Sequence, residues 1–408
     1  MMRKSFKYIL SVFIISTIML NAQGGSNYSA FGIGELHHGI GAAYDALAGT
    51  SIAVPFDGAI SNGNPAQWSF LKTTRLQTGY RFNQQRVEND KNILWQNNGK
   101  IDGMLINFCL DTALAANINL GFSAYSSVNY LIALPITIDE CGIKKTGKTI
   151  YQGQGGISQA WLGAAVKPLK WASIGASVFT LFGNIEKSAA TILYGRNSVP
   201  SRTYMRDVYS SLGFRFGLLL EPTHNLFLGA YTEINPTLTA DRELVFQSAY
   251  AKDSTITSTN IFDYPSLFGF GFSYSFNKFM IAADYIQRDY TNFTYNNGNA
   301  RFRKYSNISF GFARLGQFGY KKTFLDRATL MLGAGYKQKY LSVQGTPIDE
   351  YYGSFGISAP LIGFARLDAA ITLGVRGTID KGLIRENFGR LTISLSIGDI
   401  WFQPYKRY

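Results

Sequence analysis

The sequence predicts an all-β fold: a transmembrane antiparallel β-barrel of about 14 strands with an N-terminal plug (hatch) segment in its lumen. From Phe268 to Phe276, aromatic side chains alternate with glycine and serine, so this strand has an apolar face and a small, polar face. The same alternation recurs along the chain behind an export signal, and no continuous apolar span follows residue 22. Among structures that cross a membrane, only closed barrels use such strands.

Residues 1–22 are predicted to be a signal peptide. A cationic start with three basic residues precedes an apolar run over residues 8–20, and Ala22 provides a small residue for cleavage. The alternative is a membrane anchor, but a spanning helix needs about 20 apolar residues. We therefore expect export to the outer membrane of a Gram-negative cell.

The composition narrows the possible partners. The 408 residues carry a formal charge of +13, which falls by three to +10 when Arg3, Lys4 and Lys7 leave with the signal peptide. The sequence has no dense basic run, so nucleic acid is not an expected partner. The lipid bilayer and the phosphates of lipopolysaccharide are simpler partners for scattered cations. With two cysteines and three histidines, the sequence predicts no disulfide scaffold, metal site or cofactor.

Residues 23–72 differ from the rest of the chain. Glycine, alanine and serine dominate, and neither the period of a strand nor that of a helix is sustained. Such a segment packs closely against lumen walls of small residues, so we predict an N-terminal hatch inside the barrel. A flexible periplasmic tail is the alternative.

Residues 73–408 are predicted to form the barrel. Alternation assigns strands to Thr73–Gln85, Asp102–Asp111, Asn117–Tyr130, Gly156–Val166, Ala172–Phe182, Tyr204–Leu219, Leu226–Leu238, Pro265–Phe276, Phe279–Tyr295, Arg301–Leu315, Arg327–Val343, Tyr351–Leu361, Ala365–Thr378 and Gly389–Phe402. An even number of strands places both termini in the periplasm. Short connections are expected on that side, and long outside loops at Ile132–Gly155, Ile185–Thr203 and Thr239–Tyr264.

Two parts of the chain carry a resemblance to a known family. Asp45–Ala53 is followed by Ala59–Ala66, and Tyr264–Tyr274 is followed by Ala282–Tyr285. Both resemble segments of the FadL/TodX-type outer-membrane transport family. The resemblance implies a barrel of about 14 strands, a hatch in its lumen, and diffusion of hydrophobic compounds with lateral exit into the membrane. It also implies a plug motif formed by Asp45, Gly49, Asp57, Asn64, Pro65 and Ala66.

The end of the chain departs from the enterobacterial pattern of that family. Six residues, 403–408, follow the last predicted strand, and this tail looks like those of Bacteroidetes-type proteins. That branch also contains FadL-like barrels of the type IX secretion system, so secretion-system proteins are alternative partners.

The sequence shows no arrangement of residues suited to catalysis. His37 and His38 fall in the predicted hatch, and His224 falls in a predicted periplasmic turn. A barrel hydrolase would need its histidine beside a nucleophile or a water at the outer rim. We therefore predict no enzyme activity.

Alternation places five charged side chains on the lumen face: Arg215, Asp284, Lys337, Asp368 and Arg376. In one interpretation they pair with one another and with hatch carboxylates such as Asp45 and Asp57. In the other, one of the cations binds the carboxylate of an amphipathic ligand. The residues leave both interpretations open.

Large aromatic residues near strand ends are predicted to form interfacial belts facing lipid. They are Tyr130, Trp161, Trp171, Tyr274, Tyr290 and Trp401. Cys109 is expected to face the lumen and Cys141 to lie in an outside loop, too far apart for a disulfide.

The leading hypothesis is an outer-membrane channel for passive uptake of hydrophobic or amphipathic small molecules, such as long-chain fatty acids or aromatic compounds, gated by the plug. The alternative is a structural or interaction barrel, such as a type IX secretion-associated shuttle or scaffold. An apolar cavity between plug and wall, with an opening in the wall, would favour uptake. A packed lumen would favour the scaffold.

Overall fold

A computed structural model describes residues 25–37, 41–90, 92–140, 143–195, 200–248, 251–293, 300–317 and 322–401. The predicted signal peptide, His38, Cys141 and the C-terminal tail lie outside these ranges. Within them, no helix is both long and apolar enough to cross a membrane.

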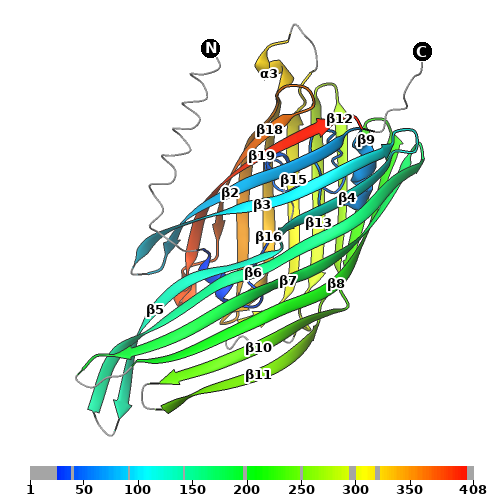
Figure 1. Ribbon diagram of the computed structural model, residues 1–408. Coiled ribbons are helices and arrows are strands. Elements are labelled where there is room, and N and C mark those ends of the chain that lie inside the picture. The colour runs from blue at the N-terminus through cyan, green and yellow to red at the C-terminus, as the bar shows by residue number, and fades with distance from the viewer. Residues whose placement is uncertain are drawn as a thin grey trace, which may run out of the picture.

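One antiparallel sheet closes on itself to form a barrel (Figure 1). Its strands are β2 (Thr74–Glu88), β3 (Ile93–Asp111), β4 (Ala116–Ala124), β5 (Ser126–Glu140), β6 (Ile143–Leu169), β7 (Ala172–Leu193), β8 (Ser201–Thr223), β9 (Leu226–Ile234), β10 (Thr237–Ser248), β11 (Ala251–Asp263), β12 (Leu267–Phe276), β13 (Phe279–Asp289), β14 (Ala300–Phe302), β15 (Lys304–Arg314), β16 (Thr329–Val343), β17 (Thr346–Pro360), β18 (Arg366–Arg376) and β19 (Arg385–Asp399). The pairs β4/β5, β9/β10, β11/β12 and β14/β15 are each two parts of one strand, so 14 strands surround the lumen in the part of the chain described. The predicted antiparallel barrel and its strand number are confirmed.

The barrel closes where the last strand meets the first. β19 pairs with β2 from Arg385 opposite Glu88 to Asp399 opposite Thr74. This ladder removes the two sheet edges that an open sheet would expose to hydrocarbon, where unpaired backbone groups cost several kcal/mol each.

Alternation along β12 sets which residues face lipid. Phe268 and Phe270 are 51% and 58% exposed, whereas Ser273 on the other face is 1% exposed. The phenylalanines face outward because the outside of the barrel is apolar lipid, and the small residues face the lumen.

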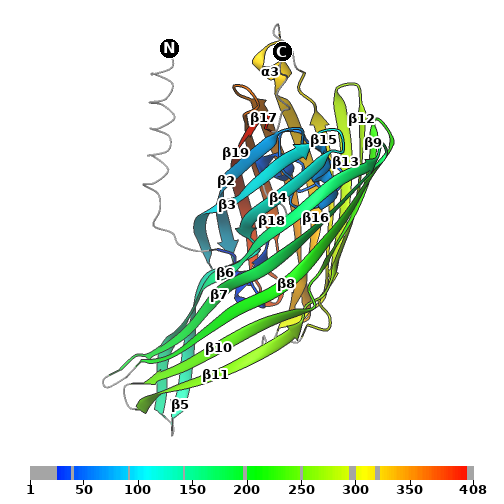
Figure 2. The same ribbon diagram turned by 45° about the vertical axis from the view of Figure 1, so that its right-hand side comes forward.

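The prediction of three long outside loops is wrong, because these residues form strands. β5 and β6 make one long hairpin, β7 and β8 a second, and β10 and β11 a third. They project beyond the rest of the barrel at the end opposite α3 (Phe324–Arg327), as Figures 1 and 2 show. We call this projection the outer sheet; it comprises β5, β10 and β11 with residues 143–155 of β6, 185–193 of β7 and 201–209 of β8.

The belt prediction holds for only half of its residues. Trp171, Tyr274 and Trp401 are exposed, whereas Tyr130, Trp161 and Tyr290 are buried and face the lumen. The indole Nε1 of Trp161 donates a hydrogen bond to Oδ1 of Asn119 at 2.8 Å. These three aromatics lie inward because they share the face of small and polar neighbours such as Gln159, which is also buried.

Residues 25–37 and 41–73, which we call the N-terminal segment, lie inside the barrel (Figure 2). The segment has little regular structure: η1 (Asn27–Ala30), β1 (Glu35–Leu36), α2 (Ala42–Asp45) and η2 (Pro65–Phe70) are its elements. A further short helix, η3 (Asp380–Gly382), connects β18 and β19.

Wall glycines let the N-terminal segment approach the strands. A Cβ atom on Gly175 of β7 would lie 2.5 Å from the carbonyl carbon of Pro65. One on Gly217 of β8 would lie 2.1 Å from Oδ1 of Asn64. A larger side chain at either position therefore collides with η2 or the residue that caps it.

We expect Gly175→Val to loosen η2 while the barrel itself still forms. Overpacking of this kind costs about 1–3 kcal/mol, so protease should cleave the N-terminal segment faster and the urea midpoint should fall. Ala176→Val, at the exposed neighbouring position, is the matched control. Equal protection of the segment in both variants would contradict the close packing described here.

Candidate functional site

The plug-motif residues hold the N-terminal segment together and against the wall. The Asn64 Nδ2 donates to the carbonyls of Ile52 and Leu218, both at 3.0 Å, and its Oδ1 accepts from the amide of Ala66. Asn64 thus caps η2 and ties it to β8, and Pro65 occupies the first turn, where a missing N–H costs nothing. Gly49 follows α2 with a φ of +82°, which favours glycine.

Asp45 anchors α2 to the wall. Its Oδ2 lies 2.8 Å from Nη2 of Arg81 in β2, whose guanidinium also lies 3.0 Å from Asp102 in β3. Asp57 behaves differently from the expectation of a lumen ion pair. It is exposed, and its Oδ1 accepts from the amide of Lys72 at 3.2 Å.

Arg376 is the centre of a buried ion cluster. Its guanidinium lies 2.5 Å from Glu35 of β1, 2.8 Å from Glu350 of β17 and 3.2 Å from Glu386 of β19. Lys337 and Lys339 of β16 each lie 3.2 Å from Glu350. The N-terminal segment and three neighbouring wall strands, β17, β18 and β19, therefore meet at Arg376.

A second cluster lies around Glu233 of β9. Its carboxylate lies 2.6 Å from Arg215 of β8 and 2.7 Å from Arg288 of β13. Arg215 also donates to the carbonyl of Asn62 in the N-terminal segment at 3.0 Å. Here too, a charged cluster of the wall binds the N-terminal segment, through the hydrogen bond from Arg215 to Asn62.

The two remaining predicted lumen acids do not form ion pairs in the described residues. Asp284 accepts hydrogen bonds from the amides of Ser51 and Ile52, at 2.6 and 2.9 Å. Asp368 is 1% exposed, beneath the N-terminal segment. All five charged residues predicted from alternation thus lie inward, and three of them pair with wall carboxylates; a role in ligand binding remains a prediction.

Sequence reasoning missed several members of these clusters. Glu350 and Glu386 lie in strands that start at Thr346 and Arg385, whereas we predicted starts at Tyr351 and Gly389 and so assigned both residues to loops. Arg81, Glu233 and Arg288 lie inside predicted strands, and their parity on the inward face was the signal that could have found them.

Aromatic side chains cross the lumen on the outer-sheet side of the ion clusters. We call Tyr125, Tyr264, Tyr290, Phe293, Phe302 and Tyr340 the aromatic cluster. The hydroxyls of Tyr125 and Tyr264 are 2.8 Å apart, and those of Tyr264 and Tyr290 are 3.0 Å apart. The rings of Tyr290 and Tyr340 are 4.9 Å apart. Because Tyr125 and Tyr340 come from opposite sides of the barrel, the cluster spans it.

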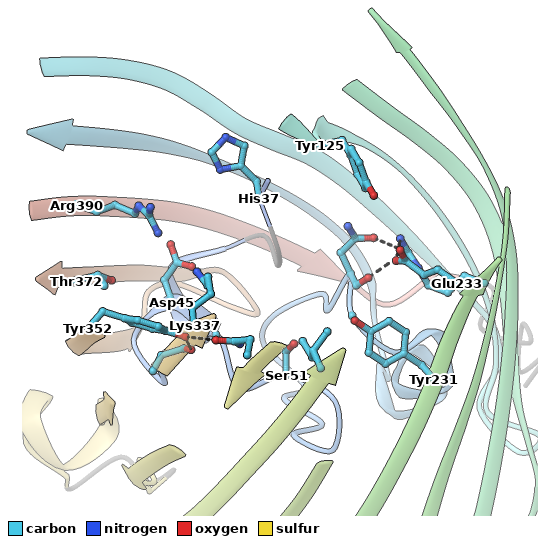
Figure 3. Close-up of a pocket in the computed structure, with 17 residues that line it drawn as sticks. His37, Asp45, Ser51, Tyr125, Tyr231, Glu233, Lys337, Tyr352, Thr372 and Arg390 are labelled. Atoms are coloured by element: carbon cyan, nitrogen blue, oxygen red, sulfur yellow. Dashed lines mark hydrogen bonds and ion pairs between the residues drawn. The ribbon is translucent and has the colours of Figure 1, made fainter. Parts of the chain in front are cut away.

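Small spaces lie between the segment and the wall in the described residues. One polar cavity has a volume of about 70 Å³. Figure 3 shows side chains that line it, among them Asp45, Tyr125, Glu233, Lys337 and Arg390. A second, of about 20 Å³, adjoins Glu35 and Lys100. A larger one of about 220 Å³ lies at the end where β2 begins. Drug-sized ligands occupy pockets of about 300–1,000 Å³.

The third barrel strand breaks at Tyr125, and the N-terminal segment covers this break from inside. The amide of Tyr125 donates to the carbonyl of Ile157, and its carbonyl accepts from the amide of His37. β1 pairs with Ser126 and Ser127 directly beside the break.

The outer sheet has one apolar face, which continues the lumen side of the barrel. Residues paired across strands share a face, and two successive rows on the lumen side run across all six strands. They contain Tyr130, Gly153, Lys187, Met205, Leu244 and Ile256, then Ile132, Tyr151, Ala189, Thr203, Phe246 and Ser254. Tyr151, Phe246 and Ile256 are exposed.

The opposite face of the outer sheet is more polar. The corresponding row there contains Asn129, Gln154, Glu186, Arg206, Glu243 and Thr257. On the lumen side, Arg242 and Asp207 form an ion pair with an N–O distance of 2.7 Å. The outer sheet is thus amphipathic. Within the described chain, η1 covers the part of the apolar face around Tyr130 and Lys187, whereas Tyr151, Phe246 and Ile256 are exposed.

Comparison with known proteins identifies the family of this chain. The family model BamG matches residues 1–407. The chain belongs to the BamG family. No curated protein matches its sequence.

Solved structures resemble this BamG-family chain in fold. A Pseudomonas aeruginosa FadL homologue is 12% identical, with a TM-score of 0.61 over 89% of this chain and 98% of that one. The Pseudomonas putida toluene transporter TodX is 16% identical, with a TM-score of 0.56 over 89% and 98%. The Ralstonia pickettii toluene transporter TbuX is 14% identical, with a TM-score of 0.56 over 88% and 98%. The FadL-type barrel is confirmed; the Bacteroidetes-type branch remains a prediction.

The described residues show no evident metal site. No group of three or more His, Cys, Asp or Glu side chains that could hold a metal ion occurs in the described ranges. The structural neighbours are transport channels. His37 hydrogen-bonds to Ser127 at 2.9 Å, and His224 lies in an exposed turn.

Arg376→Met should destabilise the barrel by about 3–5 kcal/mol, because it leaves buried carboxylates without their cation. The free energy of unfolding in urea, followed by tryptophan fluorescence, measures this loss. Arg301→Met removes an exposed arginine of β14 and should change stability by less than about 0.5 kcal/mol. Equal stability of the two variants would show that the cluster does not hold the lumen together.

Proposed function

We propose that this protein is a closed structural and interaction barrel of the outer membrane. Both termini lie in the periplasm, the N-terminal segment is a permanent plug, and the outer sheet projects outside the cell. The amphipathic outer sheet carries this proposal: its apolar lumen-side face is built as a regular surface, and within the described chain only its part around Tyr130 and Lys187 is covered. A sheet with one apolar face is stable when another layer covers that face.

The size of the face suits a protein partner. Six strands spaced about 4.8 Å apart, each with about ten residues at about 3.3 Å per residue, span about 800 Å². A standard protein–protein interface takes about 800 Å² from each partner. A small ligand would cover only a fraction of that area.

The filled lumen supports the same proposal. The aromatic cluster, two ion clusters and the N-terminal segment occupy the space through which a solute would pass. The segment also covers the break at Tyr125, where a lateral exit would need an opening. A barrel of this kind presents a surface more readily than it conducts.

The family name directs the choice of partner. BamG suggests a Bam-related protein, so we propose that a Bam-related protein, directly or within an assembly, covers the lumen-side face of the outer sheet. Components of a type IX secretion system are the alternative that the same experiment would reveal.

Introducing two negative charges on the apolar face of the outer sheet tests this function. Phe246→Asp with Ile256→Asp should remove co-purifying partners from mild-detergent extracts, while the heat-modifiable band on gels shows a folded barrel. Val245→Asp with Thr257→Asp changes the same strands on the opposite face and should retain the partners. Mass spectrometry identifies them, and unchanged partners in the first variant would refute the docking face.

Passive uptake of hydrophobic or amphipathic molecules is the second candidate, and one cavity favours it. The 220 Å³ cavity is lined by the apolar side chains of Phe56, Met331 and Phe364 and by the guanidinium groups of Arg75 and Arg366. Neither arginine makes an ion pair within the described residues. This combination suits a small molecule with an apolar body and an anionic head.

Met331→Trp separates the two candidates, because it fills this cavity from the wall of β16. If uptake is the function, fatty-acid uptake into cells should fall at least tenfold, with partner co-purification unchanged. If the interaction barrel is the function, both readouts should match the wild type, and purified protein in planar bilayers should show no steady conductance. An exposed control on the same strand is Leu332→Trp.

A further inference from the structure

We propose that the lipid-facing wall carries a binding groove for lipopolysaccharide, formed by β16–β19, β2 and β3. A shallow, open groove lies on the outside of these strands. It is separate from the lumen and from the outer sheet. The proposal uses the orientation proposed above, with the termini in the periplasm.

Cross-strand pairing explains how the groove arises. Its floor is a row of mostly short side chains that runs from Ala334 through Gly353, Leu373 and Gly389 to Gln84. The neighbouring row towards the strand ends near α3 is large and apolar: Leu332, Phe355, Ile371, Leu391 and Phe82. The row on the other side contains Tyr351, Val375, Asn387, Arg86 and Trp95. The floor therefore lies between two higher walls.

The glycines of the floor are not required by backbone packing. A Cβ on Gly353 would come no nearer than 3.7 Å to another atom, and one on Gly389 no nearer than 3.4 Å. Both distances are ordinary van der Waals contact. The space above these glycines is open to lipid, and an acyl chain lying there would bury apolar surface at about 25 cal/mol per Å².

The outer end of the groove is cationic. Arg86 and Arg385 share Glu88, with N–O distances of 3.3 and 3.1 Å. Two guanidiniums facing one carboxylate leave an excess positive charge. Each guanidinium has five N–H donors, so donors remain for the phosphate oxygens of a ligand.

The position of Arg86 and Arg385 along their strands places them at the level of the lipid head groups. Along β19 the outward residues Ile397, Leu395, Ile393 and Leu391 are exposed and apolar, and Gly389, Asn387 and Arg385 follow. The change from apolar to polar marks the membrane boundary, and exposed Trp95 lies at the same level. With the termini in the periplasm, this boundary belongs to the outer leaflet.

The charge and the apolar groove together fit one class of ligand. An anionic phosphate bound by Arg86 and Arg385, with an acyl chain along Gly353 and Gly389, is the chemistry of a phosphorylated glycolipid. Lipopolysaccharide is the lipid of that chemistry in the leaflet that the orientation gives. A neutral lipid would leave the arginines without an added partner.

Two sets of variants test the groove and its charges separately. Gly353→Leu with Gly389→Leu fills the floor, and Arg86→Gln with Arg385→Gln removes the charges. Ala369→Leu adds the same bulk elsewhere on the outward face of β18, and Arg301→Gln removes an exposed arginine elsewhere. Binding of fluorescent lipid A to purified, folded protein is measured, and phosphatidylglycerol of matched charge serves as competitor.

Lipid A should bind at least tenfold more weakly to both groove variants than to the wild type, and both controls should match the wild type. Phosphatidylglycerol should compete poorly. Unchanged lipid A binding in the groove variants would overturn the site. Equal binding of phosphatidylglycerol, lost in the same variants, would overturn lipopolysaccharide as its ligand. Partner co-purification through the outer sheet is unaffected by either result.

Discussion

Closure of the sheet in lipid is the constraint on which the rest of this structure depends. Backbone groups find no partner in hydrocarbon, so β19 must pair with β2 along its whole length. A closed ring of 14 strands encloses more space than the small inward residues of strands such as β12 can fill. The N-terminal segment and the aromatic cluster fill it, and the polar backbone of the segment needs partners in turn. Wall side chains such as Asp284 and Ser354 supply them by accepting from segment amides.

The need for every strand to be paired ends at the membrane surface. This explains why the wall extends further on one side, as the outer sheet. Outside the lipid, a strand can lose its neighbour because water solvates the free edge. The outer sheet accordingly ends in two edges, β5 and β11, and Pro135 lies within β5, a position that proline tolerates at an edge. What remains uncompensated there is the part of the apolar lumen-side face that η1 does not cover, around Tyr151, Phe246 and Ile256. A regular, extended apolar surface of this kind supports the proposed protein partner.

The sequence specified the part of the fold that lies in lipid and misjudged the part that does not. Within the bilayer, one face must be apolar, so alternation located strands such as β12 and β18 closely. In the outer sheet that demand disappears: Lys144 to Lys148 and the threonine-rich β11 carry no apolar outward row, and they were assigned to loops. The predicted site lacked two carboxylates for a related reason, since Glu350 and Glu386 lie in parts of β17 and β19 that precede the predicted strand starts. Trp161 and Tyr290 were misplaced for another reason: a filled lumen buries aromatics as readily as the lipid interface attracts them.

Energetics also bear on whether the segment could act as a ligand-driven gate. Buried ion pairs join it to the wall, and two of them are Asp45 with Arg81 and Glu35 with Arg376. Separating a buried pair costs about 3–5 kcal/mol, so displacement would require about 6–10 kcal/mol before any aromatic contact is lost. The binding energy of a ligand reaches at most about 1.5 kcal/mol per heavy atom for the smallest ligands and about 0.3 kcal/mol per heavy atom for drug-sized ones. Displacing the segment would therefore take a large share of the binding energy of a small hydrophobic molecule. A molecule that fills a cavity beside the segment, such as the one around Met331, leaves these ion pairs intact and avoids that cost.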